Sequence, residues 1–238
     1  MTRQLDVGAV VRKVFDIYVG QANVLMPAAA VVFVFSELIA GLLISERSAG
    51  LELLAALIVL VATTLFTGMV VELVADVRDG RRDARPAQLL RAVTPVLWPL
   101  IGVGLVAGVG VVLGFIFFVI PGLILLTIWS LAAPVMVLER PRVFAALARS
   151  RDLVRGNGMR VFGVIVLLVL VVRVIGYAID AVAESAGSGA GIVARVVVGV
   201  LTAPLPALAA AVLYFELGGR MPARDRVTPV EANPFGET

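Results

Sequence analysis

Four long stretches without a charged residue constrain this sequence more than any other feature. They cover residues 17–36, 53–71, 92–138 and 196–215. Because a helix needs about 20 mostly apolar residues to cross a bilayer, three of the stretches fit one membrane-spanning helix each. The stretch 92–138 is long enough for two, and Ile120-Pro121-Gly122 in its middle predicts a tight turn between them.

The composition indicates a membrane protein. Of the 238 residues, 61% are hydrophobic and 16% are charged, whereas a soluble domain has about 45–50% apolar and about 25% charged residues. A cytosolic enzyme, a disordered chain and a secreted scaffold are therefore excluded. The chain has no cysteine and no histidine, so it lacks thiol nucleophiles and the commonest general base and metal ligand. We expect no cofactor, no metal and no nucleic-acid partner.

A sixth span is predicted despite one internal charge. Residues 161–179 are apolar except for Arg173. A central arginine costs about 2.5–3.5 kcal/mol, but the Val, Leu, Ile and Phe residues of this stretch contribute about −4 to −8 kcal/mol, so insertion is favoured. We therefore expect an all-α bundle of six membrane-spanning helices. Its spans are residues 22–44, 51–75, 95–117, 121–138, 160–183 and 190–217.

The basic residues predict the orientation. All Lys and Arg residues except Arg47, Arg173 and Arg195 fall before the first span, after the even-numbered spans or in the tail. The positive-inside rule then places both termini in the cytoplasm of a bacterial cell. We expect one membrane domain over 1–218, no cleaved signal peptide, and a flexible cytoplasmic tail over 219–238, which is polar and rich in proline.

Amphipathic segments precede the hairpins of spans. Residues 6–19, 86–93 and 142–155 each place apolar side chains on one helix face and charged ones on another. Such helices either lie flat at the membrane interface, apolar side down, or cap the protein's own cytoplasmic face. The order suggests a unit of one amphipathic helix and one hairpin, repeated three times.

Short motifs along most of the chain resemble a known family. They are Leu5-Asp-Val-Gly, Ile120-Pro-Gly-Leu, Pro134-Val-Met-Val-Leu-Glu, Ala145-Ala-Leu-Ala-Arg-Ser-Arg-Asp and Leu213-Tyr-Phe-Glu-Leu. Together they are similar to the membrane domain fused to some bacterial glycerophosphoryl diester phosphodiesterases and to related uncharacterised multi-pass proteins. The ending departs from that family, because Glu216 and Gly218 stand where aspartate and arginine are usual. The resemblance implies a membrane domain without the catalytic barrel, and therefore no enzyme activity.

The cytoplasmic arginines are candidates for contact with anionic lipid. Each basic residue near an anionic leaflet contributes about 1 kcal/mol of attraction, although topology alone would also favour such charges. Glu72, Glu139 and Glu216, near the ends of three spans, form either a ring of carboxylates or ordinary ion pairs. The candidate lipid contacts are Arg81, Arg82, Arg142, Arg149, Arg151 and Arg155.

Glycine and proline patterns mark two further helices. Gly104/Gly108 and Gly110/Gly114 have the spacing of small residues that lets helices approach closely. They predict either a homodimer face or packing within the chain, and the oligomeric state stays open. Pro204 and Pro206 interrupt the last span and free backbone carbonyls near residues 200–202, either as a transport hinge or as an ordinary break.

Charged residues within the spans predict an intramembrane cluster. Arg173 lies about 20 Å along its helix beyond Arg160, and Glu37 lies about as far into the first span. An unpaired arginine there is costly, so it should find a carboxylate. We expect a structural ion pair, with a polar cavity as the alternative. The members are Glu37, Arg173, Asp180, Glu184 and Arg195.

These observations favour a multi-pass inner-membrane protein that is not an enzyme. The expected role is an accessory or scaffold domain that contacts anionic lipids or a partner membrane protein. The alternative is a small permease or lipid transporter, which would need buried polar ligands at mid-depth in the membrane.

Overall fold

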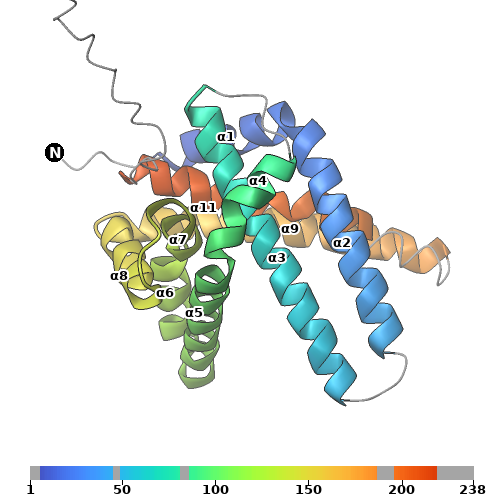
Figure 1. Cartoon of the computed structure of the whole chain (residues 1–238). Coiled ribbons are helices and arrows are strands. Elements are labelled where there is room, and N and C mark those ends of the chain that lie inside the picture. Colours follow the sequence, from blue (N-terminus) through green and yellow to red (C-terminus); the bar gives the residue numbers. More distant parts are fainter. Residues whose placement is uncertain (1–5, 45–48, 81–85, 187–195, 219–238) are drawn as a thin grey trace, which may run out of the picture.

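The computed structural model describes residues 6–44, 49–80, 86–186 and 196–218, and these residues form helices joined by short turns, with no strand (Figure 1). Five helical stretches are long and apolar enough to cross a membrane, and the bent pair of α1 and α2 is a sixth if it counts as one span. The prediction of an all-α multi-pass membrane fold is confirmed.

The helices follow the order of amphipathic helix and hairpin that the sequence suggested. Helical residues 196–202 precede the last helix. The elements are α1 Val7–Gly20, α2 Ala22–Ile44, α3 Ala49–Arg78, α4 Pro86–Val93, the 3-10 turn η1 Thr94–Val96, α5 Leu97–Phe117, α6 Val119–Trp129, α7 Ala132–Glu139, α8 Val143–Val154, α9 Gly158–Ala186 and α11 Pro204–Glu216.

The amphipathic helices bury their apolar faces against the protein itself. The Asp6 carboxylate caps α1 by accepting the N–H groups of Gly8 and Ala9 at 2.9 and 3.3 Å, and α1 is bent by 81° from α2. α1 packs on α11 and α9, α4 on α3, and α8 on α5, α6 and α7. The apolar faces of these helices therefore pack on the protein, as expected for helices that cap its own surface, and do not point outward toward lipid. The buried residues are Val10, Val14 and Ile17 of α1, Leu89 and Val93 of α4, and Ala146, Leu147, Leu153 and Val154 of α8.

The hairpin of α5 and α6 turns at one residue. Phe118 has extended backbone angles and separates the two helices, so the turn lies earlier than the expected 120–122, and Pro121 falls in the first turn of α6, where its missing N–H costs little. Gly114 faces Gly122 across the hairpin, because a Cβ atom on Gly114 would lie 2.9 Å from the Gly122 Cα. Residues 115–120 at the tip are large, apolar and exposed.

The fourth predicted span, 121–138, lies within one stretch that is long and apolar enough to cross a membrane, Val119–Glu139, but two turn residues interrupt its helix. α6 ends at Trp129 and α7 begins at Ala132. Pro134 lies in the first turn of α7 and has no N–H to donate to the Ser130 carbonyl, so one helical hydrogen bond is missing at this point. Ser150 of α8, which is fully buried, bridges the break: its Oγ donates to the Ile128 carbonyl at 2.7 Å and accepts the Leu131 N–H at 3.2 Å.

The last predicted span, 190–217, is also broken, and residues 190–195 lie outside the described part of the chain. The helical residues up to 202 end in a turn at Ala203, and α11 begins at Pro204. The Tyr18 hydroxyl of α1 donates to the Leu201 carbonyl at 2.9 Å, one turn before the break. Partial burial raises the pKa of Tyr18 above its ordinary value of 10.0, so the hydroxyl stays protonated and able to donate at neutral pH.

The hydrophobic core surrounds the C-terminal half of α3, which packs on α4, α5, α7 and α11, and it extends to α1 on α11 and to α8 on α7. The C-terminal ends of α3, α7 and α11 lie beside this core and carry Arg78, Glu139 and Glu216. We call these three helix ends, with the helices packed around them, the charged end. Away from it, α2, α3, α5 and α6 extend apolar surfaces outward, among them Phe35, Leu53 and Val112. α9 and α11 run across the direction of α3 (Figure 1). Such apolar, unpaired helix surfaces suit contact with lipid.

Candidate functional site

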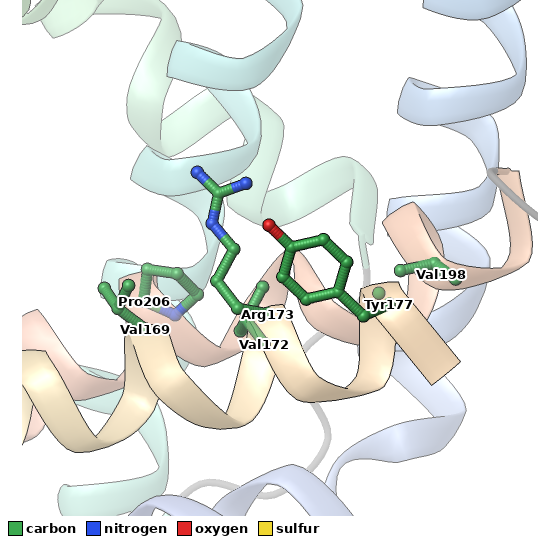
Figure 2. Close-up of a pocket in the computed structure, with 7 residues that line it drawn as sticks. Val169, Val172, Arg173, Tyr177, Val198 and Pro206 are labelled. Carbon is green, nitrogen blue, oxygen red and sulfur yellow. The ribbon is translucent and has the colours of Figure 1, made fainter. Parts of the chain in front are cut away.

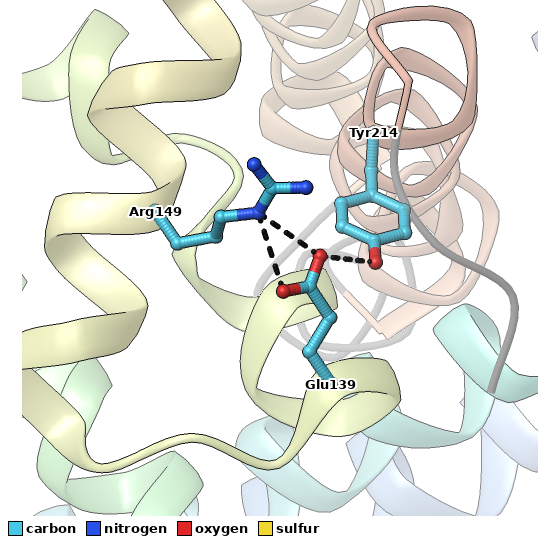
Figure 3. Close-up of polar contacts among 3 residues, drawn as sticks. All are labelled: Glu139, Arg149 and Tyr214. Atoms are coloured by element: carbon cyan, nitrogen blue, oxygen red, sulfur yellow. Dashed lines mark hydrogen bonds and ion pairs between the residues drawn. The ribbon is translucent and has the colours of Figure 1, made fainter. Parts of the chain in front are cut away.

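A polar network ties three helices together at the charged end. Arg149 of α8 donates its Nε–H to both carboxylate oxygens of Glu139, at 3.2 Å each, and the Tyr214 hydroxyl of α11 donates to Glu139 Oε1 at 2.8 Å (Figure 3). Tyr214 is fully buried, and a buried tyrosine hydroxyl requires an acceptor. Glu139, the last residue of α7, supplies it and holds Arg149 at the same time.

Arg149 keeps binding capacity after this pairing. Only its Nε contacts Glu139, and its two terminal nitrogens point away from the carboxylate in Figure 3. They form no hydrogen bond or ion pair with a residue that the structure describes, and the Arg149 side chain is 32% exposed. A guanidinium has five N–H donors, so Arg149 can bind an anion from outside while Glu139 fixes its orientation.

A second group of charges joins α1, α3 and α11. Lys13 Nζ lies 2.6 Å from Glu216 Oε1, and Arg78 Nη1 lies 3.9 Å from the same oxygen. The Arg78 guanidinium also stacks 4.7 Å from the centre of the Phe215 ring. Since these side chains are partly exposed, we assign the ion pairs about 0–1 kcal/mol each. Glu72 on α3 is buried at 5% exposure. The contacts of Lys13 and Arg78 with Glu216 are ordinary ion pairs between helices.

The outward face of α8 carries arginines beside an exposed aromatic ring. Phe144, Arg151 and Arg155 lie at intervals of seven and four residues and therefore share one helix face. All three are exposed, Phe144 to 74%. The two arginines form no ion pair with a residue in the described ranges. Met159, at the start of α9, is 82% exposed. We call Phe144, Arg151, Arg155 and Met159 the α8 surface.

The other candidate lipid contacts fall in two groups. Arg142, at the N-cap of α8, is exposed, whereas Arg149 turns toward Glu139. Arg81 and Arg82 lie outside the described residues. The lipid contacts therefore remain a prediction. Among the described candidates, Arg142, Arg151 and Arg155 are exposed and Arg149 is partly exposed.

A groove lies at Arg173, in the middle of α9. It has a volume of about 420 Å³ and is lined by Val169, Val172, Arg173, Gly176 and Tyr177 of α9 and by Val198 and Pro206 of the last span. Figure 2 shows the Arg173 guanidinium and the Tyr177 hydroxyl on the same side of α9. Both side chains are exposed. A polar edge thus adjoins apolar walls.

The predicted intramembrane cluster stays a prediction. Arg173 makes no ion pair with a side chain in the described part of the chain. Glu37 belongs to α2, and Asp180 and Glu184 belong to α9, but their side chains lie outside the description, as does all of Arg195. The groove at Arg173 has mostly apolar walls, and the polar cavity expected as the alternative stays a prediction as well.

The glycine pairs of α5 face different surroundings. Cβ atoms on Gly110 and Gly114 would collide with Trp129 and Gly122 of α6, whereas Cβ atoms on Gly104 and Gly108 would meet nothing within 4 Å. Gly110 and Gly114 therefore serve packing within the chain. The homodimer hypothesis is left with Gly104 and Gly108 only.

The comparisons with known proteins place this site in an uncharacterised family. A family model described as a domain of unknown function (DUF8558) matches residues 88–217, which is more than half of the chain. The chain belongs to the DUF8558 family. It is also 35% identical, over 98 residues, to a UPF0259 membrane protein of Pectobacterium carotovorum subsp. carotovorum. That match covers 41% of this chain and 39% of the relative, so the chain spans well under half of that protein's length. No solved structure matches.

The matched DUF8558 region contains both candidate sites, the Glu139–Arg149–Tyr214 network and the Arg173 groove. The relative is named a membrane protein, and the apolar helices of this chain fit a multi-pass one. The two matches support the expected class of uncharacterised membrane protein but not the name of the phosphodiesterase membrane domain.

Sequence reasoning missed the roles of Tyr214, Ser150 and Tyr18. Tyr18 and Tyr214 lie within apolar stretches, whereas Ser150 stands between Arg149 and Arg151. Each carries a hydroxyl, which needs a hydrogen-bond partner when it is buried. That signal marks the residues as paired, although it does not identify the partner. Tyr214 and Glu139 are 75 positions apart, and Tyr18 and Leu201 are 183 apart.

Proposed function

We propose that this DUF8558 protein is a non-enzymatic accessory or scaffold protein of the bacterial cell membrane. It has both termini in the cytoplasm, and its charged end contacts the anionic lipids of the cytoplasmic leaflet. A partner membrane protein would dock on the same charged end. The observation that carries the proposal is the α8 surface, where Arg151 and Arg155 stand exposed between Phe144 and Met159.

The surroundings of these four side chains suit contact with a membrane surface. An exposed aromatic ring and a methionine beside two arginines match a helix that lies in the interface between water and bilayer. The apolar face of α8 is already buried on α5, α6 and α7, so the protein holds α8 in place before any lipid binds. Each arginine near an anionic leaflet contributes about 1 kcal/mol.

A binding experiment tests this assignment. Purified protein in detergent is titrated with dioleoyl phosphatidylglycerol and, separately, with dioleoyl phosphatidylcholine, and bound lipids are counted by native mass spectrometry. Two lost contacts of about 1 kcal/mol each predict that Arg151→Gln/Arg155→Gln weakens phosphatidylglycerol binding by about 10- to 30-fold. Phosphatidylcholine binding should change little.

The matched control is Arg224→Gln/Arg226→Gln, which removes the same net charge from the C-terminal stretch. It should bind phosphatidylglycerol as the unmodified protein does. If both double variants lose the same affinity, total charge and not the α8 surface attracts the lipid, and the assignment fails. Unchanged binding in the α8 variant would refute it as well.

The orientation has its own test. A cytoplasmic-type reporter should be active when it is fused after Thr238 or inserted at Gly80, and a periplasmic-type reporter should be active at Ala49 and Gly187. The expectation follows from the concentration of basic residues on one side of the spans. Periplasmic activity at Thr238 would mean that the segment containing Arg173 does not cross the membrane.

The second candidate function is a small permease or lipid transporter. The groove at Arg173 favours it, because transport sites lie near mid-depth beside broken helices, and the last span breaks at Pro204. Lipid or solute flux into proteoliposomes that depends on Arg173 would support this function over the scaffold role.

A further inference from the structure

Arg173 is a charge without a described counter-charge in an apolar helix. It is the sixteenth residue of α9, Gly158–Ala186, about 20 Å from Arg160 along the helix axis, and its neighbours from 161 to 172 are all uncharged. Arginine at this depth costs about 2.5–3.5 kcal/mol on insertion scales. Such residues face a bundle interior or a cavity and mark binding pathways, and Arg173 faces the groove.

The groove has one polar edge and otherwise apolar walls. Val169, Arg173 and Tyr177 follow each other at intervals of four residues and line one face of α9. Gly176 beside them leaves open space, because a Cβ atom there would meet nothing within 4 Å. On the other side stand Val198 and Pro206, and a proline ring has no N–H to offer.

We propose that this groove binds an oxyanion carried on an acyl chain. The Arg173 guanidinium pairs with the phosphate or carboxylate group, a geometry for which its planar fork is suited, and the Tyr177 hydroxyl donates a further hydrogen bond. The acyl chain lies along the valines. This site is separate from the α8 surface, and it holds whether or not that surface binds lipid.

Three properties of the groove favour an anion with an acyl chain. A guanidinium in apolar surroundings binds an oxyanion more strongly than one in water, because the local dielectric is low. A volume of about 420 Å³ falls within the usual range for ligand sites, about 300–1,000 Å³. The Arg173 and Tyr177 polar groups lie on the same side of α9 (Figure 2), so both can reach one anion.

The test measures the binding of oleate and dioleoyl phosphatidylglycerol to the full-length protein in detergent. Oleyl alcohol, which has the chain but no charge, is the reference. Both anions or one of them should bind at least tenfold more tightly than oleyl alcohol. Binding of oleate alone identifies a fatty-acid carboxylate, and binding of phosphatidylglycerol alone identifies a phospholipid phosphate.

Three variants locate the site. Arg173→Gln should weaken anion binding at least tenfold, and Arg173→Lys should recover part of the loss, since it restores the charge. Val198→Phe should weaken binding by filling the groove while Arg173 stays in place. Arg224→Gln, which removes the same charge outside both sites, should leave oleate binding unchanged. Oleate binding that is lost in Arg155→Gln but kept in Arg173→Gln would place the anion on the α8 surface and overturn this proposal alone, so its failure is distinct from failure of the proposed function.

Two outcomes would overturn the proposal. One is equal binding of both anions to the Arg173→Gln variant and to the unmodified protein. The other is that Arg173→Gln and Glu37→Gln each lower the melting temperature without ligand while the double variant recovers it, since Arg173 would then serve a structural ion pair with Glu37.

Discussion

Replacing Gly114 with alanine should lower the free energy of unfolding by about 1–3 kcal/mol, which is the cost of overpacking a tight contact. The added Cβ would lie 2.9 Å from the Cα and 3.0 Å from the N of Gly122, and these are backbone atoms that cannot rotate away. In an unconstrained helix the same change is stabilising by about 0.5–1 kcal/mol. The sign of the effect therefore reports the close approach of α5 and α6.

Gly108→Ala is the matched control on the same helix. A Cβ at Gly108 would meet nothing within 4 Å, so this variant should be as stable as the unmodified protein or more stable. Thermal unfolding in detergent, followed by circular dichroism, separates the two. If Gly114→Ala melts at the same temperature as Gly108→Ala, the two helices do not touch at Gly114 and Gly122.

Removing the Ser150 hydroxyl should cost about 2–4 kcal/mol of stability. The Oγ atom serves the Ile128 carbonyl and the Leu131 N–H at the break between α6 and α7, and Ser150 is fully buried. Ser150→Ala leaves both backbone groups without this partner, and each buried unsatisfied group costs about 1–3 kcal/mol. The expected result is a clear drop in melting temperature.

Ser130→Ala provides the comparison for this prediction. The Ser130 hydroxyl donates only to the Thr127 carbonyl of its own helix, at 2.8 Å, so its loss should cost about 1 kcal/mol or less. Chemical unfolding of both variants under identical detergent conditions gives the difference. Equal stability of Ser150→Ala and Ser130→Ala would show that Ser150 does not bridge the break.

The helices could be predicted from the sequence because a helix that crosses lipid needs a long run of apolar residues, which the sequence shows directly. α2 begins and ends at the residues predicted for the first span, 22–44, although Glu37 falls inside it. The interruption before Pro204 was predicted. The one before Pro134 was missed, although a proline without an N–H to donate follows it as well.

The candidate site could be predicted only in part, because its partners are far apart in the sequence. Arg173 could be identified as a candidate from the sequence because it is a single charge in an apolar run. The pairing of Lys13 with Glu216, 203 positions apart, depends on α1 lying against α11. The identity of such partners follows from helix packing, which periodicity and charge do not encode.

The turn at Phe118 has a consequence for how the chain enters the membrane. Residues 115–120 are apolar, and the nearest charges are Arg91 and Glu139, on the far sides of α5 and α7. No hydrophilic loop has to be carried across the bilayer at this corner. α5 and α6 can therefore enter as a closed pair in one step, driven by the transfer of their own apolar surface out of water.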